Sequence, residues 1–166
     1  MKVVIVGCGR VGAVLAEAFE KAGNDVIILD RSTGAFDKLP STFRGNAVRG
    51  DGTDEDVLRR AGAQDADVFL ALTEGDNRNV MAAQLATEAL NVGRVLAKVN
   101  DPVRAAAYAD LGLATICRTN LMEDTILGFA GLSTAQRPPI LAPQGTHPGG
   151  EHHRAEAEPA AATSEA

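Results

Sequence analysis

Three glycines near the start of the chain have the spacing of a phosphate-binding turn. Gly7, Gly9 and Gly12 form the pattern G-x-G-x-x-G directly after a short β-branched run. The first glycine allows a tight turn, the second lets backbone approach a pyrophosphate closely, and the third lets a helix pack on a strand. The helix start at Arg10 and Val11 then faces the phosphates with free N–H groups and its positive dipole end. A purely structural glycine turn is the alternative.

An acidic residue at the end of the second predicted strand completes this pattern. Asp30 lies eighteen residues after Gly12, where a carboxylate can accept hydrogen bonds from both ribose hydroxyls. Asp30 disfavours NADP because its carboxylate would repel a 2′-phosphate. The neighbouring Arg31 could attract that phosphate, so NADP is not excluded. A polar strand end without a ligand is the other interpretation of Asp30. We predict a nucleotide site built on this strand–turn–helix–strand unit.

The elements that must position these residues alternate between strand and helix along the whole chain. Strands are predicted at residues 2–6, 26–29, 47–49, 67–72, 94–99 and 114–117. Helices are predicted at residues 10–22, 32–39, 54–61 (capped by Thr53), 77–90, 102–110 (capped by Asp101) and 119–132. This alternation predicts an α/β fold, a Rossmann-like, doubly wound parallel six-stranded sheet in the order 3-2-1-4-5-6. A ligand then lies at the carboxyl ends of the strands, beside the first strand.

Composition limits the class of protein. Residues are 45% hydrophobic but only 4% aromatic, which predicts an aliphatic core, and the net charge of −6 argues against nucleic-acid binding. No apolar run approaches the length of a transmembrane helix, and the first strand leaves no room for a signal peptide. Cys8 and Cys117 are interpreted as reduced cytosolic thiols. Redox sensing by Cys8 is the alternative, because a helix N-terminus lowers a thiol pKa.

The composition changes abruptly at Ser133. Residues 133–166 hold five of the seven prolines and all three histidines, and they have no hydrophobic period. We therefore predict one domain at residues 1–132 followed by a disordered tail at residues 133–166. The tail histidines carry no metal-site prediction, because metal sites need ligands held in a fixed geometry.

Residue types also argue against catalysis. The predicted domain contains no histidine, so Ser-His-Asp and Cys-His arrangements are excluded there. The single tyrosine, Tyr108, is followed four residues later by Gly112, which excludes a Tyr-x-x-x-Lys pair. We therefore predict a nucleotide sensor that is not an enzyme. An NAD-dependent oxidoreductase and an assembly module without a ligand are the alternatives.

A longer signature carries a family resemblance. The segments VVIVGCGRVG, GDGTDEDVLRRAGAQDADVFLALTEGDNRNVMAA and RVLAKVNDP occur in this order. With them, residues 1 to about 132 resemble the nucleotide-binding N-terminal domain of potassium-conductance regulators, called TrkA-N, KTN or RCK-N. The resemblance implies a cytoplasmic regulatory subunit that binds NAD(H) or ATP/ADP as a ligand. It also implies a homodimer or higher ring on a membrane potassium-translocating subunit (TrkH- or KtrB-like) or a channel pore.

The resemblance assigns roles to individual residues, each with a structural alternative. Arg10 matches a basic residue that points at phosphates, sometimes across the dimer. Asp51 and Gly52 match the loop that edges the adenine, with a plain turn as the alternative. Thr73 can reach a phosphate or the distal ribose, or can serve only the turn. Lys98 can reach a phosphate or a partner subunit, or can be a simple polar strand edge.

The sequence departs from the family in two places. Many members carry an acid after the sixth strand, where it helps to bind a cation, but here the stretch reads Arg118-Thr119-Asn120. The resemblance therefore does not extend to a cation there. The family's C-terminal ligand-binding domain, RCK-C, is expected to be absent, with the tail in its place, and this leaves the ring size open.

Overall fold

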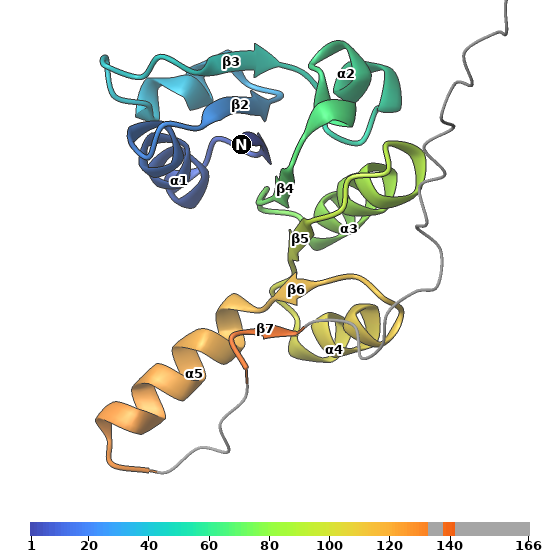
Figure 1. Ribbon diagram of the computed structural model, residues 1–166. Coiled ribbons are helices and arrows are strands. Elements are labelled where there is room, and N and C mark those ends of the chain that lie inside the picture. The colour runs from blue at the N-terminus through green and yellow to red at the C-terminus, as the bar shows by residue number, and fades with distance from the viewer. Residues whose placement is uncertain (133–137, 142–166) are drawn as a thin grey trace, which may run out of the picture.

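The computed structural model describes residues 1–132 and 138–141 and shows one twisted sheet with helices on both faces (Figure 1). The strands are Lys2–Val6 (β1), Asp25–Asp30 (β2), Asn46–Arg49 (β3), Val68–Ala71 (β4), Val95–Lys98 (β5), Thr115–Ile116 (β6) and Ile140–Leu141 (β7). Their order in the sheet is β3-β2-β1-β4-β5-β6-β7. The first six strands pair in parallel. The predicted Rossmann-like order 3-2-1-4-5-6 is therefore confirmed.

The helices follow the strands as predicted, with differences at their ends. The α-helices are Arg10–Lys21 (α1), Glu55–Arg60 (α2), Asp76–Gln84 (α3), Pro102–Asp110 (α4) and Arg118–Phe129 (α5). Short 3₁₀ turns occupy Thr33–Lys38 (η1) and Ala63–Asp65 (η2), and a π-helical turn at Leu85–Ala89 (η3) extends α3. Within the described residues, no helix is both long enough and apolar enough to cross a membrane.

Side-chain capping confirms one predicted helix start and corrects another. The Asp101 carboxylate accepts hydrogen bonds from the N–H groups of Val103 and Arg104, at 2.9 and 3.0 Å, as predicted for α4. The predicted cap of α2 is wrong, because Asp54 and not Thr53 accepts from the Val57 N–H, at 3.2 Å. The Thr53 hydroxyl instead donates a hydrogen bond to the Asp51 carboxylate of the same loop.

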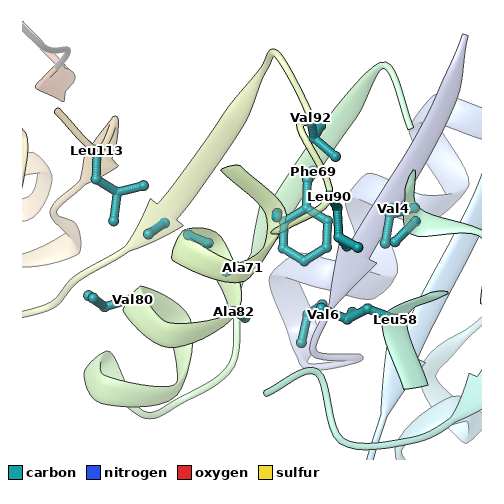
Figure 2. Packing of buried hydrophobic residues seen from close by; sticks show 14 of the residues in the cluster. Val4, Val6, Leu58, Phe69, Ala71, Val80, Ala82, Leu90, Val92 and Leu113 are labelled. Atoms are coloured by element: carbon teal, nitrogen blue, oxygen red, sulfur yellow. The ribbon is translucent and has the colours of Figure 1, made fainter. Parts of the chain in front are cut away.

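Alternation along β1 divides the core into two layers. Val3 and Ile5 pack in the cluster that α1 and η1 cover, whereas Val4 and Val6 pack in the larger cluster under α2, α3 and α4. Figure 2 shows the larger cluster, in which Phe69 lies among aliphatic side chains. Phe69 is the largest fully buried side chain of the described residues. The core is aliphatic, as the composition predicts.

The seventh strand corrects the prediction of six. Ile140 and Leu141 pair antiparallel with Ile116 and Thr115 at the edge of the sheet. This strand falls inside the segment predicted to be disordered. It could not be predicted, because two apolar residues beside prolines show no strand period. Proline is tolerated at such an edge. The rest of the predicted tail, residues 133–137 and 142–166, lies outside the described residues.

The last helix extends away from the body of the domain (Figure 1). Asn120 is the buried residue of α5, and the exposed fractions of Met122, Ile126 and Phe129 are 56%, 59% and 96%. Apolar residues at this helical spacing form a stripe that the described part of the chain leaves open. A stripe of this kind is typical of a surface that packs against another element or chain.

A buried asparagine joins the carboxyl ends of β4 and β5. Asn79 of α3 is fully buried, and its Oδ1 accepts hydrogen bonds from the N–H and the hydroxyl of Thr73, both at 2.7 Å. Its Nδ2 donates to the carbonyl oxygens of Thr73 and Lys98, at 2.9 and 2.8 Å. All four hydrogen bonds end on residues that follow or close a strand. Asn79 therefore fixes the edge of the sheet on which the site is built.

Replacing this side chain tests its role in the fold. Asn79→Ala leaves the Thr73 N–H and the Lys98 carbonyl without their partner, so we expect the free energy of unfolding to fall by about 2–3 kcal/mol. Urea denaturation followed by circular dichroism measures this loss. Gln84→Ala, an exposed position on the same helix, is the matched control, with an expected change within about 0.5 kcal/mol. Equal losses in both variants would show that Asn79 has no special role.

Candidate functional site

A cleft of about 920 Å³ crosses the carboxyl edge of the sheet. Its lining comes from the loops after β1, β2, β3 and β4, from Lys98 at the end of β5, and from Arg118 after β6. This is the edge where ligands bind in doubly wound folds, and the volume lies within the range of small-molecule pockets. The glycine turn after β1 lies at the middle of the strand order.

The fold restricts two of the three turn positions to glycine, each for a different reason. Gly7 has φ of +107°, and a Cβ there would lie 2.8 Å from the Thr73 nitrogen. A Cβ at Gly12 would lie 2.0 Å from the Gly7 carbonyl oxygen, so Gly12 allows α1 to pack against the turn. A Cβ at Gly9 would meet no heavy atom within 4 Å, although Gly9 lines the cleft. The fold therefore has room for a side chain at position 9, although a glycine occupies it.

Asp30 ties the glycine turn to the loop after β2. Its Oδ2 accepts the Cys8 N–H at 2.8 Å, and its Oδ1 accepts the Ser32 N–H at 2.9 Å. Each carboxylate oxygen can accept more than one hydrogen bond, so ribose hydroxyls can still bind. Asp30 lines the cleft. Its carboxylate thus combines a structural role with the position predicted for a ribose partner.

Cys8 does not have the low pKa that its place in the sequence suggested. The residue is fully buried in the core cluster under α1. Burial raises the pKa of the thiol, and the nearby Asp30 carboxylate raises it further, against the opposing effect of Lys38. The thiol packs in the core, away from solvent. Burial and the raised pKa argue against the alternative that Cys8 is a low-pKa redox sensor.

The loop after β3 is held by its own hydrogen bonds. Asp51 Oδ1 accepts from the N–H and hydroxyl of Thr53, at 3.0 and 2.8 Å, and Oδ2 lies 3.6 Å from Arg31 Nε. The Thr53 N–H and hydroxyl lower the pKa of Asp51, and Arg31 adds to this effect. A Cβ at Gly52 would lie 2.2 Å from Val6 Cγ1, so close packing on β1 requires this glycine. Both Asp51 and Gly52 line the cleft.

Asp76 joins the start of α3 to the loop after β5. Its carboxylate accepts from the N–H and side-chain amide of Asn100, at 3.0 and 2.8 Å, and from the Asp101 N–H at 3.2 Å. Burial acts to raise the pKa of Asp76, but these hydrogen bonds outweigh it and hold the pKa below its usual value. The Asp76 carboxylate therefore accepts hydrogen bonds from the loop after β5, and Asp76 does not line the cleft.

The cleft is basic although the chain is acidic. Six basic residues and three acidic residues line it, whereas the whole chain has 16 basic and 22 acidic residues. The basic residues are Arg10, Arg31, Lys38, Arg78, Lys98 and Arg118. The described residues contain no group of His, Cys, Asp and Glu that could hold a metal ion. Such a lining favours a polyanionic ligand.

The structure brings most of the predicted site residues together. The predicted residues that line the cleft are Gly7, Gly9, Arg10, Val11, Asp30, Arg31, Asp51, Gly52, Thr73 and Lys98. Gly12 lies behind the turn and does not line the cleft. Arg78, Arg118 and Lys38 were not predicted. Their cationic type was visible in the sequence, but their approach to one cleft depends on the packing of α3, α5 and η1.

A parallel sheet of this order, with a glycine turn after its first strand and a polar cleft at its carboxyl edge, defines a Rossmann-like nucleotide-binding domain. The TrkA-N domain model matches residues 3–119, so this chain belongs to the TrkA-N domain family. The Trk system potassium uptake protein TrkA of Streptomyces coelicolor is 43% identical over 127 residues, which are 76% of this chain and 57% of that protein. The chain thus spans little more than half the length of that relative.

Solved structures share the fold. The Kef CTD of Shewanella denitrificans, in its AMP-bound form, has a TM-score of 0.64 and 25% identity, over 80% of this chain and 84% of that structure. The TrkA-N domain of the inner membrane protein ybaL from Escherichia coli has a TM-score of 0.68 and 18% identity, over 77% and 95% of the two chains. Both comparisons cover most of the described residues.

Proposed function

We propose that residues 1–132 form a cytoplasmic nucleotide-sensing domain that regulates a potassium transporter or channel. The observation that carries this proposal is the cleft, in which the bare backbone of Gly9, the Asp30 carboxylate and a basic lining meet at the carboxyl edge of the sheet. Membership of the TrkA-N family supplies the link to potassium. The AMP-bound state of the Kef CTD supports an adenine nucleotide as the ligand class.

The ligand proposed is NAD(H) or ATP/ADP, acting as a signal and not as a redox cofactor. Both classes share the adenosine half, and the proposal assigns its contacts to Asp30 and Asp51, which line the cleft. Among the side chains that line the cleft there is no histidine or tyrosine to handle a substrate proton. A regulatory ligand needs only differential affinity for two conformations. We therefore assign the cleft to sensing and not to catalysis.

The proposal includes a homodimer or larger ring that contacts a membrane potassium-translocating subunit, TrkH- or KtrB-like, or a channel pore. The apolar stripe of α5, with Ile126 and Phe129 exposed, supports an assembly in which a second copy covers this helix. Ligand binding at the cleft then changes the relative stability of two dimer arrangements and thereby biases the membrane partner.

Nucleotide binding is the first test. Isothermal titration with ATP, ADP, NAD⁺ and NADH should show saturable binding of at least one nucleotide at submillimolar concentration. Gly9→Ala should weaken this binding by about tenfold or more, because a methyl group enters the path of the phosphates while the fold has room for it.

The control for this substitution is Gly93→Ala. Gly93 also has open space around its position and does not line the cleft, so binding should be unchanged. Thermal unfolding of both variants should match the parent protein. If no nucleotide binds at millimolar concentration, the sensing function is refuted; if Gly9→Ala binds normally, the assigned phosphate position is refuted.

Assembly through α5 is tested by mass in solution. Sedimentation equilibrium should give about twice the chain mass of 17.2 kDa or a higher multiple. The double variant Ile126→Ser, Phe129→Ser should shift the equilibrium to monomer, because it removes the apolar stripe. Val103→Ser is the control, since Val103 is 79% exposed on α4. A parent protein that stays monomeric at every concentration would refute this assembly.

Potassium regulation is tested in cells. A strain that lacks this chain should show altered potassium uptake when external potassium is limiting, and the parent gene should restore it. The Gly9→Ala gene should restore it poorly, because regulation requires the nucleotide. Uptake that is the same with and without the chain would refute the potassium role while leaving nucleotide binding intact.

A further inference from the structure

The buried amide of Asn79 fixes the cleft lining after β4. Its Oδ1 accepts the N–H and the hydroxyl of Thr73, both at 2.7 Å, and its Nδ2 donates to the carbonyl oxygens of Thr73 and Lys98, at 2.9 and 2.8 Å. An amide side chain has two acceptor positions and two N–H donors, so all four are used. Reversing the amide would direct its N–H groups at the Thr73 N–H and its oxygen at two carbonyl oxygens. The network therefore admits one orientation of Asn79.

These hydrogen bonds leave Thr73 without a donor for a ligand. Its N–H and its one hydroxyl proton are both donated to Asn79. The Gly75 carbonyl oxygen lies 3.4 Å from Thr73 Oγ1 and is a longer, weaker alternative for that proton. The Gly75 N–H donates to Thr73 Oγ1 at 3.3 Å, which uses one of the two lone pairs of this oxygen. Thr73 lines the cleft, so the group that its side chain can offer a ligand is the second lone pair.

Thr73 lies directly beside the glycine turn. A Cβ at Gly7 would lie 2.8 Å from the Thr73 nitrogen, and β4 pairs with β1 in the sheet. A ligand whose phosphates lie at the turn therefore brings its next group past Thr73. An ionised phosphate oxygen only accepts hydrogen bonds, as Thr73 does here, whereas a sugar hydroxyl can donate one. Hydrogen-bond polarity thus favours a hydroxyl over a phosphate oxygen at this point.

Charge does not decide what lies beside Thr73. On the side of β4 to β6, one acid and three cations line the cleft, namely Glu74, Arg78, Lys98 and Arg118. The acid favours a hydroxyl and repels a phosphate, whereas the cations attract a phosphate. The role of Thr73 must therefore be tested by substitutions that leave all of these charges in place.

We propose that Asn79 is a positioning residue that makes Thr73 an acceptor only, so that the cleft takes a ligand with a sugar hydroxyl beside the glycine turn. The ligand class that fits is a nucleotide with a second sugar beyond its pyrophosphate, as in ADP-ribose and NAD(H). Asn79 is fully buried and does not line the cleft, so it acts through the Thr73 hydroxyl. This inference rests on the proposed function, because it assumes that the turn holds the phosphates.

The test compares ligands that differ by one sugar. Isothermal titration with ADP and with ADP-ribose, both in EDTA, gives the affinity of each variant for each ligand. Thr73→Val removes the hydroxyl and keeps the side-chain shape, so the affinity for ADP-ribose should fall about fivefold while that for ADP changes less than about twofold. Thr73→Ser keeps the hydroxyl and should keep both affinities. Thr87→Val makes the same change at an exposed position outside the cleft and should have no effect.

Asn79→Ala separates positioning from stability. Without the amide, the Thr73 hydroxyl is free to donate to a phosphate oxygen, so the ratio of the ADP-ribose affinity to the ADP affinity should fall by about threefold or more. A purely structural role would lower both affinities together and leave the ratio unchanged. Circular dichroism at the titration temperature shows whether this variant is folded. If it is not, Thr73→Val still tests the inference.

The outcomes separate this inference from the function on which it rests. If Thr73→Val weakens ADP as much as ADP-ribose, Thr73 serves a phosphate, and the inference is refuted while nucleotide sensing stands. If Thr73→Val changes neither affinity, Thr73 does not contact the ligand, and the inference is refuted as well. If Asn79→Ala is folded and keeps the parent ratio, Asn79 is not a positioning residue. If the parent protein binds no nucleotide, the proposed function fails, and this inference fails with it.

Discussion

The hydrogen bond from the Cys8 N–H to the Asp30 carboxylate connects the ends of the two central strands. Asp30 closes β2, and Cys8 lies inside the turn that follows β1, so this bond of 2.8 Å fixes the turn against its neighbouring strand. Gly7 and Gly12 close the same turn from behind, one against the Thr73 backbone and the other against the Gly7 carbonyl. Of the three turn glycines, Gly9 is thus the one with open space around its backbone at the cleft. The turn is therefore rigid before any ligand arrives, which lowers the entropic cost of binding.

The cleft has a basic lining although the protein as a whole is acidic. The net charge of −6 would repel a nucleotide at long range, yet the cleft itself has more basic than acidic residues. Local field dominates close to the site because distant surface charges are screened by salt. Two acids in or near the cleft accept hydrogen bonds from the protein itself: Asp51 accepts from Thr53, and Asp76 accepts from the loop after β5. These hydrogen bonds fix the positions of both carboxylates.

Sequence patterns predicted the fold well because they are local. Buried β-branched runs, glycine stops and the Asp101-Pro102 start each act within a few residues, and their alternation sets the sheet order. The two failures in the fold are also local. Thr53 and Asp54 are both good capping residues, and the choice between them depends on the turn in which Asp51 engages Thr53. The edge strand at Ile140–Leu141 is too short to have a period.

The contributions of α3 and α5 to the site could not be predicted from the sequence, for a different reason. Asn79 is one of five polar or charged residues in the nine-residue helix α3, and nothing in its neighbours predicts that four hydrogen bonds converge on it. Arg78 and Arg118 lie forty residues apart, and they meet the same cleft only because α3 and α5 both start at the carboxyl edge of the sheet. Lys98, by contrast, was predicted from the resemblance, since it belongs to a recognisable strand motif.

The position of Arg118 links the cleft to the exposed helix. Arg118 is the first residue of α5, and Phe129 is the last, so one helix of about 18 Å extends from the lining of the cleft to the end of the apolar stripe. A helix transmits a shift of its first turn to its far end, because its backbone hydrogen bonds keep it stiff. An anion bound at Arg118 would therefore act on the element that carries the exposed Ile126 and Phe129. Such coupling requires that the two arrangements of α5 differ in their affinity for the ligand, and it is reciprocal: covering the stripe must change nucleotide affinity by the same factor.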